Sequence, residues 1–249
     1  MKYLLVIAFA TCGFAHTIGR SLVEDKIVGG TLASPGQFPY QISERLYGSH
    51  FCGGSIINKY TILTAAHCVD GTDPKGLNIV VGSNKLNQGG MWYYVSRYTM
   101  HANWNPATVI NDIAVIKLIA PIQYTTYVKA IAIDTNFTPG GSPCVLSGWG
   151  YTSYPGTTPN DLLYLKAKVV DLNQCRKDLP PSDFPILDSN ICAFSSEGIG
   201  ACSGDSGGPL VSNNKQIGVT SWVFLCAVGV PDVYTRVSYY SSWIEAQAQ

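Results

Sequence analysis

Short apolar segments separated by turn residues run along most of the chain. From Ile27 onward, stretches rich in Val, Ile, Thr and Tyr alternate with Gly, Pro, Asn and Asp. Segments of this kind, about four to eight residues long, are typical of all-β domains built from many short strands. The pattern therefore predicts one such domain over 27–249, with strands at 40–43, 54–57, 61–64, 77–81, 113–118, 166–170 and 217–222.

Helix signals are few. Residues 65–68 predict a turn or two of helix, and 238–248 form the best candidate for a longer one. Ser238 can cap this segment, Trp243 and Ile244 supply an apolar patch, and its Ala, Glu and Gln residues favour helix. No repeat of about 20–50 residues divides the chain, so one compact unit is expected.

The first fifteen residues have the pattern of a signal peptide. Lys2 supplies the positive charge, residues 4–10 are apolar, and Gly13 and Ala15 are small residues before a cleavage point. The alternative is a buried N-terminal helix or strand, but the order of charge, apolar run and small residues favours the signal. The run is too short to span a bilayer. We therefore expect a secreted, extracellular protein with no membrane anchor.

Composition narrows the functional classes. The chain has 249 residues, 46% of them hydrophobic, and its formal net charge is zero. That length and apolar content are sufficient for a well-buried core. Because no basic run of about five or more residues occurs, neither nucleic acid nor an anionic membrane is expected as a partner.

The cysteine content fits an oxidising compartment. Cys12 would leave with the signal peptide, so seven cysteines remain in the mature chain and at least one must be unpaired. Six cysteines allow 15 pairings, so spacing alone does not fix the connectivity. A zinc site is not favoured, because no Cys-x-x-Cys pair occurs. The seven are Cys52, Cys68, Cys144, Cys175, Cys192, Cys202 and Cys226.

The segment 204–209, Gly-Asp-Ser-Gly-Gly-Pro, is the first candidate for chemistry. A serine between glycines can occupy a tight turn that exposes its hydroxyl and points neighbouring N–H groups at one spot. Most Gly/Ser-rich stretches are only loops, but this order of residues is more specific. It makes Ser206 a candidate nucleophile.

A serine nucleophile needs a base, and histidine is the side chain suited to that role near neutral pH. His67 follows three small residues and precedes Cys68, which could tether its segment. Asp112 lies just before an apolar strand, where a buried carboxylate could hold the imidazole tautomer. Taken alone, His67 could be structural and Asp112 a turn residue. Together with Ser206 they form a candidate catalytic triad.

In the order His, Asp, Ser, the chain resembles the chymotrypsin–trypsin family of serine endopeptidases. The resemblance covers 27–249 and includes the motifs at 27–30, 52–55, 148–150, 221–222 and 231–234. It implies two packed six-stranded antiparallel β-barrels with a C-terminal helix. It further implies nucleophilic attack by Ser206, acid–base catalysis by His67, and an oxyanion hole formed by the N–H groups of Gly204 and Ser206.

The same resemblance implies that the protein is a zymogen. Residues 16–26 would be an activation propeptide, and cleavage after Lys26 by a trypsin-like protease would free the ammonium group of Ile27. That group would pair with Asp205 and order the oxyanion loop. The implied disulfides are Cys52–Cys68, Cys175–Cys192 and Cys202–Cys226. Cys144 is expected to be a free, buried thiol, because Ser212 stands where its partner would be.

The primary specificity pocket departs from the trypsin-like pattern. Gly200 stands where those relatives carry an aspartate, and Asp232 occupies a second position at the pocket base. Val223 should narrow the entrance with its β-branched side chain. We expect a chymotrypsin- or elastase-like preference, with a basic preference through Asp232 as the alternative. The other substrate-binding residues implied are Ser203, Ser221 and Trp222.

An active digestive endopeptidase is thus the leading hypothesis. An inert homologue acting as a binding protein is the first rival, but His67, Asp112 and Ser206 are all retained. A regulatory protease of a cascade is the second rival. Such proteases usually carry extra N-terminal modules, whereas a short segment separates the expected signal from Ile27. The expected partners are protein and peptide substrates, an activating protease and protein protease inhibitors, with a monomeric enzyme. No metal or cofactor is expected, because 82–90 lack an acidic cluster. Asn136 begins a possible glycosylation motif.

Overall fold

Residues 28–249 are described by the computed structural model. The expected signal peptide, the propeptide and Ile27 lie outside the described residues. The first half of the chain forms a closed barrel in the order β2-β3-β4-β7-β6-β5, in which every neighbouring pair is antiparallel. Its strands are β2 (Gln41–Leu46), β3 (Ser49–Asn58), β4 (Thr61–Thr64), β5 (Leu77–Val81), β6 (Met91–Met100) and β7 (Ala114–Leu118).

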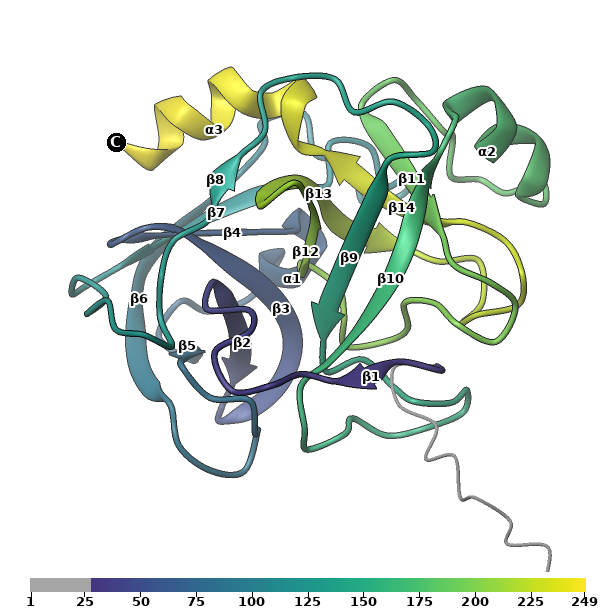
Figure 1. The fold of residues 1–249 in the computed structure, drawn as a ribbon. Coiled ribbons are helices and arrows are strands. Elements are labelled where there is room, and N and C mark those ends of the chain that lie inside the picture. The colour runs from purple at the N-terminus through teal and green to yellow at the C-terminus, as the bar shows by residue number, and fades with distance from the viewer. Residues whose placement is uncertain (1–27) are drawn as a thin grey trace, which may run out of the picture.

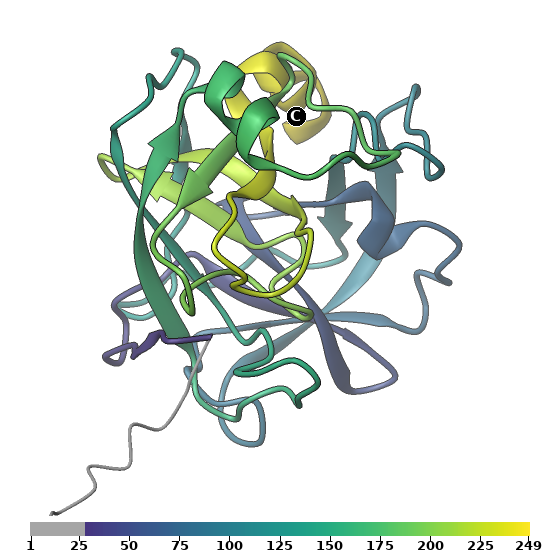
Figure 2. The same ribbon diagram turned by 90° about the vertical axis from the view of Figure 1, so that its right-hand side faces the viewer.

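The second half forms another antiparallel barrel, in the order β10-β11-β14-β13-β12-β9, which closes where β9 pairs with β10. Two short strands pair with strands of this barrel: β1 (Thr31–Leu32) with β10, and β8 (Ala132–Ile133) with β13. The two barrels lie beside each other (Figures 1 and 2). The expected architecture is therefore confirmed. The strands are β9 (Pro143–Gly148), β10 (Leu163–Val170), β11 (Asn190–Phe194), β12 (Pro209–Ser212), β13 (Lys215–Trp222) and β14 (Asp232–Arg236).

Alternating side chains explain why these segments form barrels. Along β10, Leu163, Leu165 and Val169 are buried, whereas Lys166 and Lys168 face solvent. Successive side chains of a strand point to opposite faces, so one face of β10 enters the barrel interior. Fully burying an aliphatic side chain contributes about 1.5–3 kcal/mol. Each interior is accordingly filled by residues such as Ile42, Ile56, Ile62, Leu77 and Ile79 in the first barrel.

Within the described part of the chain, three α-helices and one 3₁₀ helix accompany the barrels: α1 (Ala66–Val69), α2 (Leu172–Asp178), η1 (Val237–Tyr240) and α3 (Ser241–Ala248). The expected cap of the C-terminal helix is wrong. Helix α3 begins after Tyr240 with no side-chain cap, because Ser238 lies within η1 and its carbonyl accepts a bond from Ser241. None of the helices in 28–249 is long and apolar enough to cross a bilayer.

Helix α3 belongs to the second half of the chain but packs on the first barrel (Figure 1). Tyr240 and Ile244 are buried in one cluster with Leu63, Ile113 and Val115. The chain's C-terminal segment therefore covers the outer face of β4 and β7, next to the residues that carry His67 and Asp112.

A glutamate is buried on β2 of the first barrel. Glu44 follows Ile42 by two positions on β2 and is fully buried. Burial raises the pKa of its carboxyl from 4.5 to about 8, although a hydrogen bond from Thr64 opposes the shift. The folded protein therefore holds Glu44 protonated at neutral pH.

The substitution Glu44→Gln is expected to stabilise the protein more at pH 7 than at pH 5. The folded pKa lies above the unfolded value, so the stability linked to Glu44 is complete below pH 4.5 and is lost as pH rises toward 8. At about 1.4 kcal/mol per pH unit, the gain in the free energy of unfolding from Glu44→Gln should be about 2–3 kcal/mol larger at pH 7 than at pH 5. Urea unfolding of both proteins at the two pH values measures it, and a gain independent of pH would contradict the buried neutral carboxyl.

Candidate active site

Both barrels contribute to the site. His67 lies on α1, directly after β4, and Asp112 lies just before β7, so both come from the first barrel. Ser206 lies in the loop between β11 and β12, and Ser221 lies on β13 of the second barrel. The structure thus brings together segments that are far apart in the sequence.

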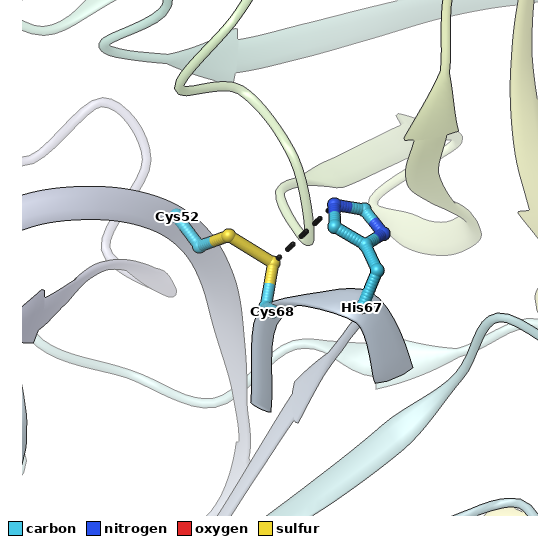
Figure 3. A group of neighbouring side chains, drawn as sticks. All are labelled: Cys52, His67 and Cys68. Carbon is cyan, nitrogen blue, oxygen red and sulfur yellow. Dashed lines mark hydrogen bonds between the residues drawn. A yellow bond between two sulfur atoms is a disulfide. The ribbon is translucent and has the colours of Figure 1, made fainter. Parts of the chain in front are cut away.

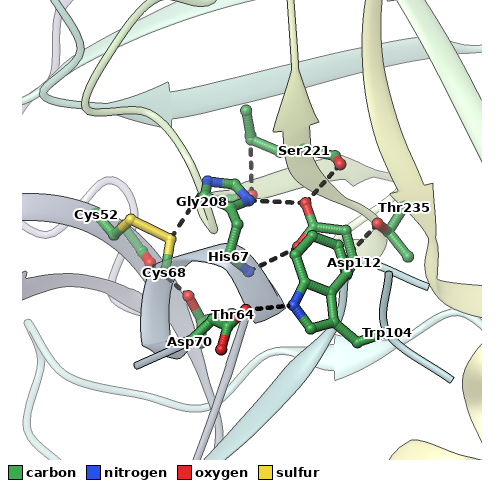
Figure 4. A network of polar contacts seen from close by, with 12 residues as sticks. Cys52, Thr64, His67, Cys68, Asp70, Trp104, Asp112, Gly208, Ser221 and Thr235 are labelled. Carbon is green, nitrogen blue, oxygen red and sulfur yellow. Dashed lines mark hydrogen bonds and ion pairs between the residues drawn. A yellow bond between two sulfur atoms is a disulfide. The ribbon is translucent and has the colours of Figure 1, made fainter. Parts of the chain in front are cut away.

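Asp112 is the centre of a polar network (Figure 4). Its side chain is 1% exposed and accepts three hydrogen bonds. Oδ1 accepts the backbone N–H of His67 at 2.9 Å, and Oδ2 lies 2.8 Å from His67 Nδ1 and 2.6 Å from Ser221 Oγ. Thr235 also donates to the Asp112 carbonyl, at 2.6 Å. Because these contacts come from both barrels, the carboxylate is fixed and oriented toward the imidazole.

His67 is held in a defined orientation by that carboxylate. Burial alone would lower the pKa of His67, but the hydrogen bond and the charge of Asp112 raise it above its ordinary value. Since the Asp112 carboxylate can only accept, Nδ1 carries a proton and Nε2 of the neutral ring has a free lone pair. The arrangement therefore suits His67 as a base acting through Nε2.

A disulfide lies next to this imidazole (Figure 3). Cys52 and Cys68 are bonded, and Cys68 Sγ lies 3.7 Å from His67 Nε2. These three residues offer donor atoms within 4.8 Å of one another, but both sulfurs are in the disulfide and are not thiolates. The bond therefore attaches α1 to β3 rather than forming a metal site.

The segment that carries Ser206 is attached to the same strand. Gly53, next to Cys52 on β3, donates its N–H to the Ser206 carbonyl at 2.7 Å. Gly207 has a φ of +77°, a conformation that L side chains rarely adopt, and Thr64 leaves no space for a Cβ there. No hydrogen bond joins Ser206 Oγ to His67 within 28–249. Ser206 is nevertheless hydrogen-bonded to β3, the strand that carries Cys52 of the disulfide beside His67.

Two N–H groups of the loop point to no acceptor within 28–249. Gly204, with a φ of +99°, and Ser206 make no backbone N–H bond there, whereas Asp205 donates to Cys202 at 3.0 Å. Free N–H groups on either side of a bonded one are available for an oxyanion.

Asp205 stabilises this loop from beneath. It is fully buried, and its two oxygens accept N–H groups from Gly150 at 2.8 Å and Cys202 at 3.0 Å. Burial raises its pKa to about 7, although both hydrogen bonds oppose the shift. A Cβ at Gly148 or Gly150 would fall on the carboxylate, so both positions require glycine.

His50 is a residue of this site that the sequence analysis missed. Burial lowers its pKa to about 4, so the ring is neutral. Its Nε2 lies 3.1 Å from the Gly204 carbonyl and its Nδ1 lies 2.9 Å from Ser43 Oγ. Since a carbonyl can only accept, Nε2 carries the proton and Nδ1 accepts from Ser43. His50 therefore fixes the orientation of Gly204, and only the structure reveals this contact.

The expected pocket residues come from two segments joined by the Cys202–Cys226 disulfide. Gly200 and Ser203 flank it on one side, and Ser221, Trp222 and Val223 precede it on the other. Asp232 on β14 is 7% exposed, and its Oδ2 accepts the Ala201 N–H at 2.8 Å. Burial is the largest cause that raises the pKa of Asp232 to about 7. Asp232 is therefore bonded to the segment between Gly200 and the disulfide.

A hollow of about 420 Å³ lies beside His67. Trp104, Pro106 and Val109 form one wall, and Trp222 forms another. Trp104 Nε1 donates to Asp70 at 2.8 Å, and Val109 has a φ of +55°, which is strained for a β-branched residue. The Asn105-Pro106 turn signal was visible in the sequence, but nothing in the sequence linked this loop to the site.

The remaining cysteines follow the implied pairing. Cys175 is bonded to Cys192, and Cys144 is a free, buried cysteine. Ser212 Oγ donates instead to the Pro143 carbonyl at 2.7 Å. Burial raises the pKa of Cys144 to about 12, so its thiol is unreactive near neutral pH.

The start of the described chain lies against the pocket wall. Gly200 donates its N–H to the Val28 carbonyl at 3.3 Å, and Gly29 packs against Ile199. Val28, the second residue after the expected cleavage point, is thus bonded to a residue of the expected pocket.

Comparisons with known proteins agree with this geometry. The trypsin family model matches residues 27–244. The chain is 37% identical to trypsin epsilon of Drosophila erecta, over 100% of this chain and 99% of that protein. It is 36% identical to trypsin alpha-4 of Lucilia cuprina, over 100% and 98%. It is 41% identical to chymotrypsin-2 of Vespa crabro, over 88% of this chain and 98% of that one.

Proposed function

Because this chain belongs to the trypsin family of serine endopeptidases, we propose that it cleaves peptide bonds with His67, Asp112 and Ser206 as its catalytic triad. Ser206 Oγ attacks the scissile carbonyl while His67 Nε2 takes its proton, and His67 then gives that proton to the leaving amine as the C–N bond breaks and an ester to Ser206 remains. His67 next takes a proton from the water that attacks this ester, and returns it to Ser206 Oγ as the carboxylic acid product leaves. The single observation that carries the proposal is the Asp112 carboxylate, bonded at once to His67 and Ser221. Catalytic hydrogen bonds in substrate-free enzymes are often long, so we expect the Ser206–His67 bond to form in the substrate complex.

The oxyanion of the tetrahedral intermediate would be bound by the N–H groups of Gly204 and Ser206. Their freedom from other acceptors within 28–249 and the contact of His50 with Gly204 support this role. Each such donor is worth about 10²–10³ in rate.

Activation would follow cleavage between Lys26 and Ile27, after a secretory signal at 1–15 is removed. The new ammonium group would pair with the buried Asp205 carboxylate. Two observations support the coupling: Asp205 holds the oxyanion loop through Cys202, and Val28 is bonded to Gly200 of the pocket. The disulfides support an extracellular destination. An activating trypsin-like protease and protein inhibitors are the partners that follow, with a monomer as the active form.

For primary specificity we propose a chymotrypsin- or elastase-like preference for apolar residues, in which Val223 favours small or medium-sized side chains. Val223 packs against the core cluster of the second barrel, so its side chain cannot easily turn away from the pocket entrance. Asp232 already accepts a hydrogen bond from Ala201, which supports a structural role at the floor. The alternative, a basic preference, rests on the same Asp232 when it is ionised.

The substitution Val223→Gly is expected to shift selection toward larger side chains. Removing the β-branched group widens the entrance, and such pocket changes are worth about 1–3 kcal/mol. The ratio of kcat/KM for a Phe substrate over an Ala substrate should rise by about 10–100-fold. Matched peptides measure the ratio, and the control is Val145→Gly, because Val145 lines a different hollow that contains none of the expected pocket residues. An unchanged ratio would contradict the proposal that Val223 narrows the entrance of the pocket.

The test of the whole proposal is hydrolysis of peptides that vary only at the residue before the cut. The enzyme is the zymogen cleaved after Lys26, with its new terminus verified to be Ile27, and Ser206→Ala is the control. Hydrolysis that disappears in the control supports the mechanism, and the preferred residue decides between Val223 and Asp232. Cleavage after several residue types also supports the digestive role we propose. No hydrolysis of any peptide would refute the enzyme.

A further inference from the structure

Glu44 has no part in the proposed mechanism, yet it lies directly behind the nucleophile segment. Its carboxyl is fully buried, and Oε1 has no hydrogen-bond partner within 28–249. Oε2 has one partner, Thr64 Oγ1, at 3.1 Å. Charged residues are almost never fully buried without a partner, so this carboxyl calls for an explanation.

Thr64 has one hydroxyl proton and two acceptors within reach. Its Oγ1 lies 3.1 Å from Glu44 Oε2 and 3.0 Å from the Gly53 carbonyl. A hydroxyl donates only once. When Glu44 is protonated, it donates to Thr64 and Thr64 donates to Gly53. When Glu44 is ionised, the carboxylate accepts the hydrogen bond of the Thr64 hydroxyl, and the Gly53 carbonyl loses its donor.

Gly53 connects this choice to the reacting residues. Its N–H donates to the Ser206 carbonyl at 2.7 Å, and Thr64 Oγ1 occupies the space beside Gly207. Thr64 also lies three residues before His67 on the same connection. The hydrogen bonds therefore run from Glu44 through Thr64 and Gly53 to Ser206.

We propose that Glu44 is a positioning residue for the triad: its protonated carboxyl directs the Thr64 hydroxyl to Gly53 and thereby holds Ser206 in its reactive place. This inference rests on the proposed protease function and adds to it a proton switch inside the first barrel. The direction is set, because only the protonated state satisfies Thr64 and Gly53 together. Activity should therefore fall when Glu44 ionises in alkaline solution.

Among residues 28–249, no charged group is hydrogen-bonded to Glu44. The residues paired with Glu44 are Cys52 on β3, which is in a disulfide, and Ile79 on β5, which does not titrate. Burial and the Thr64 bond are the causes that act on the pKa of Glu44. The other titratable groups nearby are engaged elsewhere: Arg45 with Leu86, His50 with Gly204, His67 with Asp112, and Tyr93 with Gln123.

The experiment is the pH profile of kcat between pH 6 and 9.5 for the activated enzyme and for Glu44→Gln, whose amide donates to Thr64 at every pH. The wild type should lose about five- to tenfold more activity across the alkaline range than the variant, the worth of one hydrogen bond. The Ile27 amine titrates in the same range, at about pH 8 when unperturbed, but does so identically in both proteins. The difference between the profiles therefore isolates Glu44.

Thr64→Val and Thr64→Ser make the test independent of whether Glu44→Gln folds. Valine removes the hydroxyl that links Glu44 to Gly53, so Thr64→Val alone should lack the alkaline fall linked to Glu44, whereas Thr64→Ser should preserve the wild-type fall. Parallel profiles for the wild type and Glu44→Gln would overturn the inference, as would an alkaline fall that Thr64→Val leaves intact. If the activated wild type were inactive at every pH, the proposed protease function itself would be refuted, which distinguishes that failure from failure of the Glu44 inference.

Discussion

The substitution Asp112→Asn is expected to lower kcat by about 10⁴ with little change in KM, the size of loss found when this change is made in serine protease triads. The carboxylate accepts all of its side-chain hydrogen bonds, two of them from His67. The backbone N–H of His67 can only donate, so the amide oxygen of Asn must face it. The amide NH₂ then faces His67 Nδ1 and Ser221.

That orientation reverses the imidazole. An NH₂ group donates to Nδ1, so the ring proton moves to Nε2, where it blocks the lone pair that must take the Ser206 proton. Steady-state kinetics with a fixed peptide, corrected for the fraction of folded enzyme, measures the loss. The matched control is Ser221→Ala, which removes one bond to Oδ2 and should cost only about tenfold. An Asp112→Asn enzyme within tenfold of the wild type would show that Asp112 does not set the tautomer.

The second large effect is expected from Asp205→Asn, which should lower kcat/KM by about 10²–10³. Both carboxylate oxygens accept backbone N–H groups, from Gly150 and Cys202, so one of them would meet an amide NH₂ instead. Gly148 and Gly150 leave the new group no room to turn away. The ammonium group of Ile27 would also lose its charged partner, and breaking a buried pair costs about 3–5 kcal/mol.

Asp232→Asn is the matched control for this change. Asp232 is another buried carboxyl of the second barrel, with its pKa also raised to about 7, but one backbone N–H bonds to it. On an apolar substrate we expect it to cost less than tenfold. Circular dichroism should show both variants folded. Equal losses in the two variants would mean that Asp205 acts through general stability rather than through the oxyanion loop.

Much of the strand pattern was readable from the sequence, and the exceptions have physical causes. The strands predicted at 61–64 and 77–81 coincide with β4 and β5, because both are short runs rich in Ile, Leu, Val and Thr that are almost entirely buried. Strand β6 was not predicted. Its exposed face carries Trp92 and Tyr94 while Tyr93 and Val95 are buried, so apolar residues occupy both faces and hide the period of two.

Helix α2 was missed for another reason. Asp171 caps it by accepting N–H groups from Asn173 and Gln174, a signal that is visible in the sequence but is also common in turns. Because α2 has seven residues and little apolar periodicity, its sequence does not distinguish a short helix from a turn.

The residues of the candidate site likewise fall into two groups: those that short motifs suggest and those that only contacts in the folded structure reveal. Ser206, His67 and Asp112 could be proposed from the sequence because their three short motifs occur together in one chain. His50, Val109 and Glu44 were not, because each acquires its role from contacts across the fold: with Gly204, with the hollow beside His67, and with Thr64. A lone histidine or glutamate in a sequence carries no sign of such a partner.

The position of α3 has a consequence for how the protein is made. The strands of the first barrel, 41–118, leave the ribosome well before Tyr240 and Ile244, which complete its outer face. At about 5–20 residues per second, the exposed face of β4 and β7 would wait for several seconds or more. During that interval the nascent first half would present apolar surface, formed by Leu63, Ile113 and Val115, to chaperones or to other chains. Completion of the nascent fold would therefore depend on its final helix.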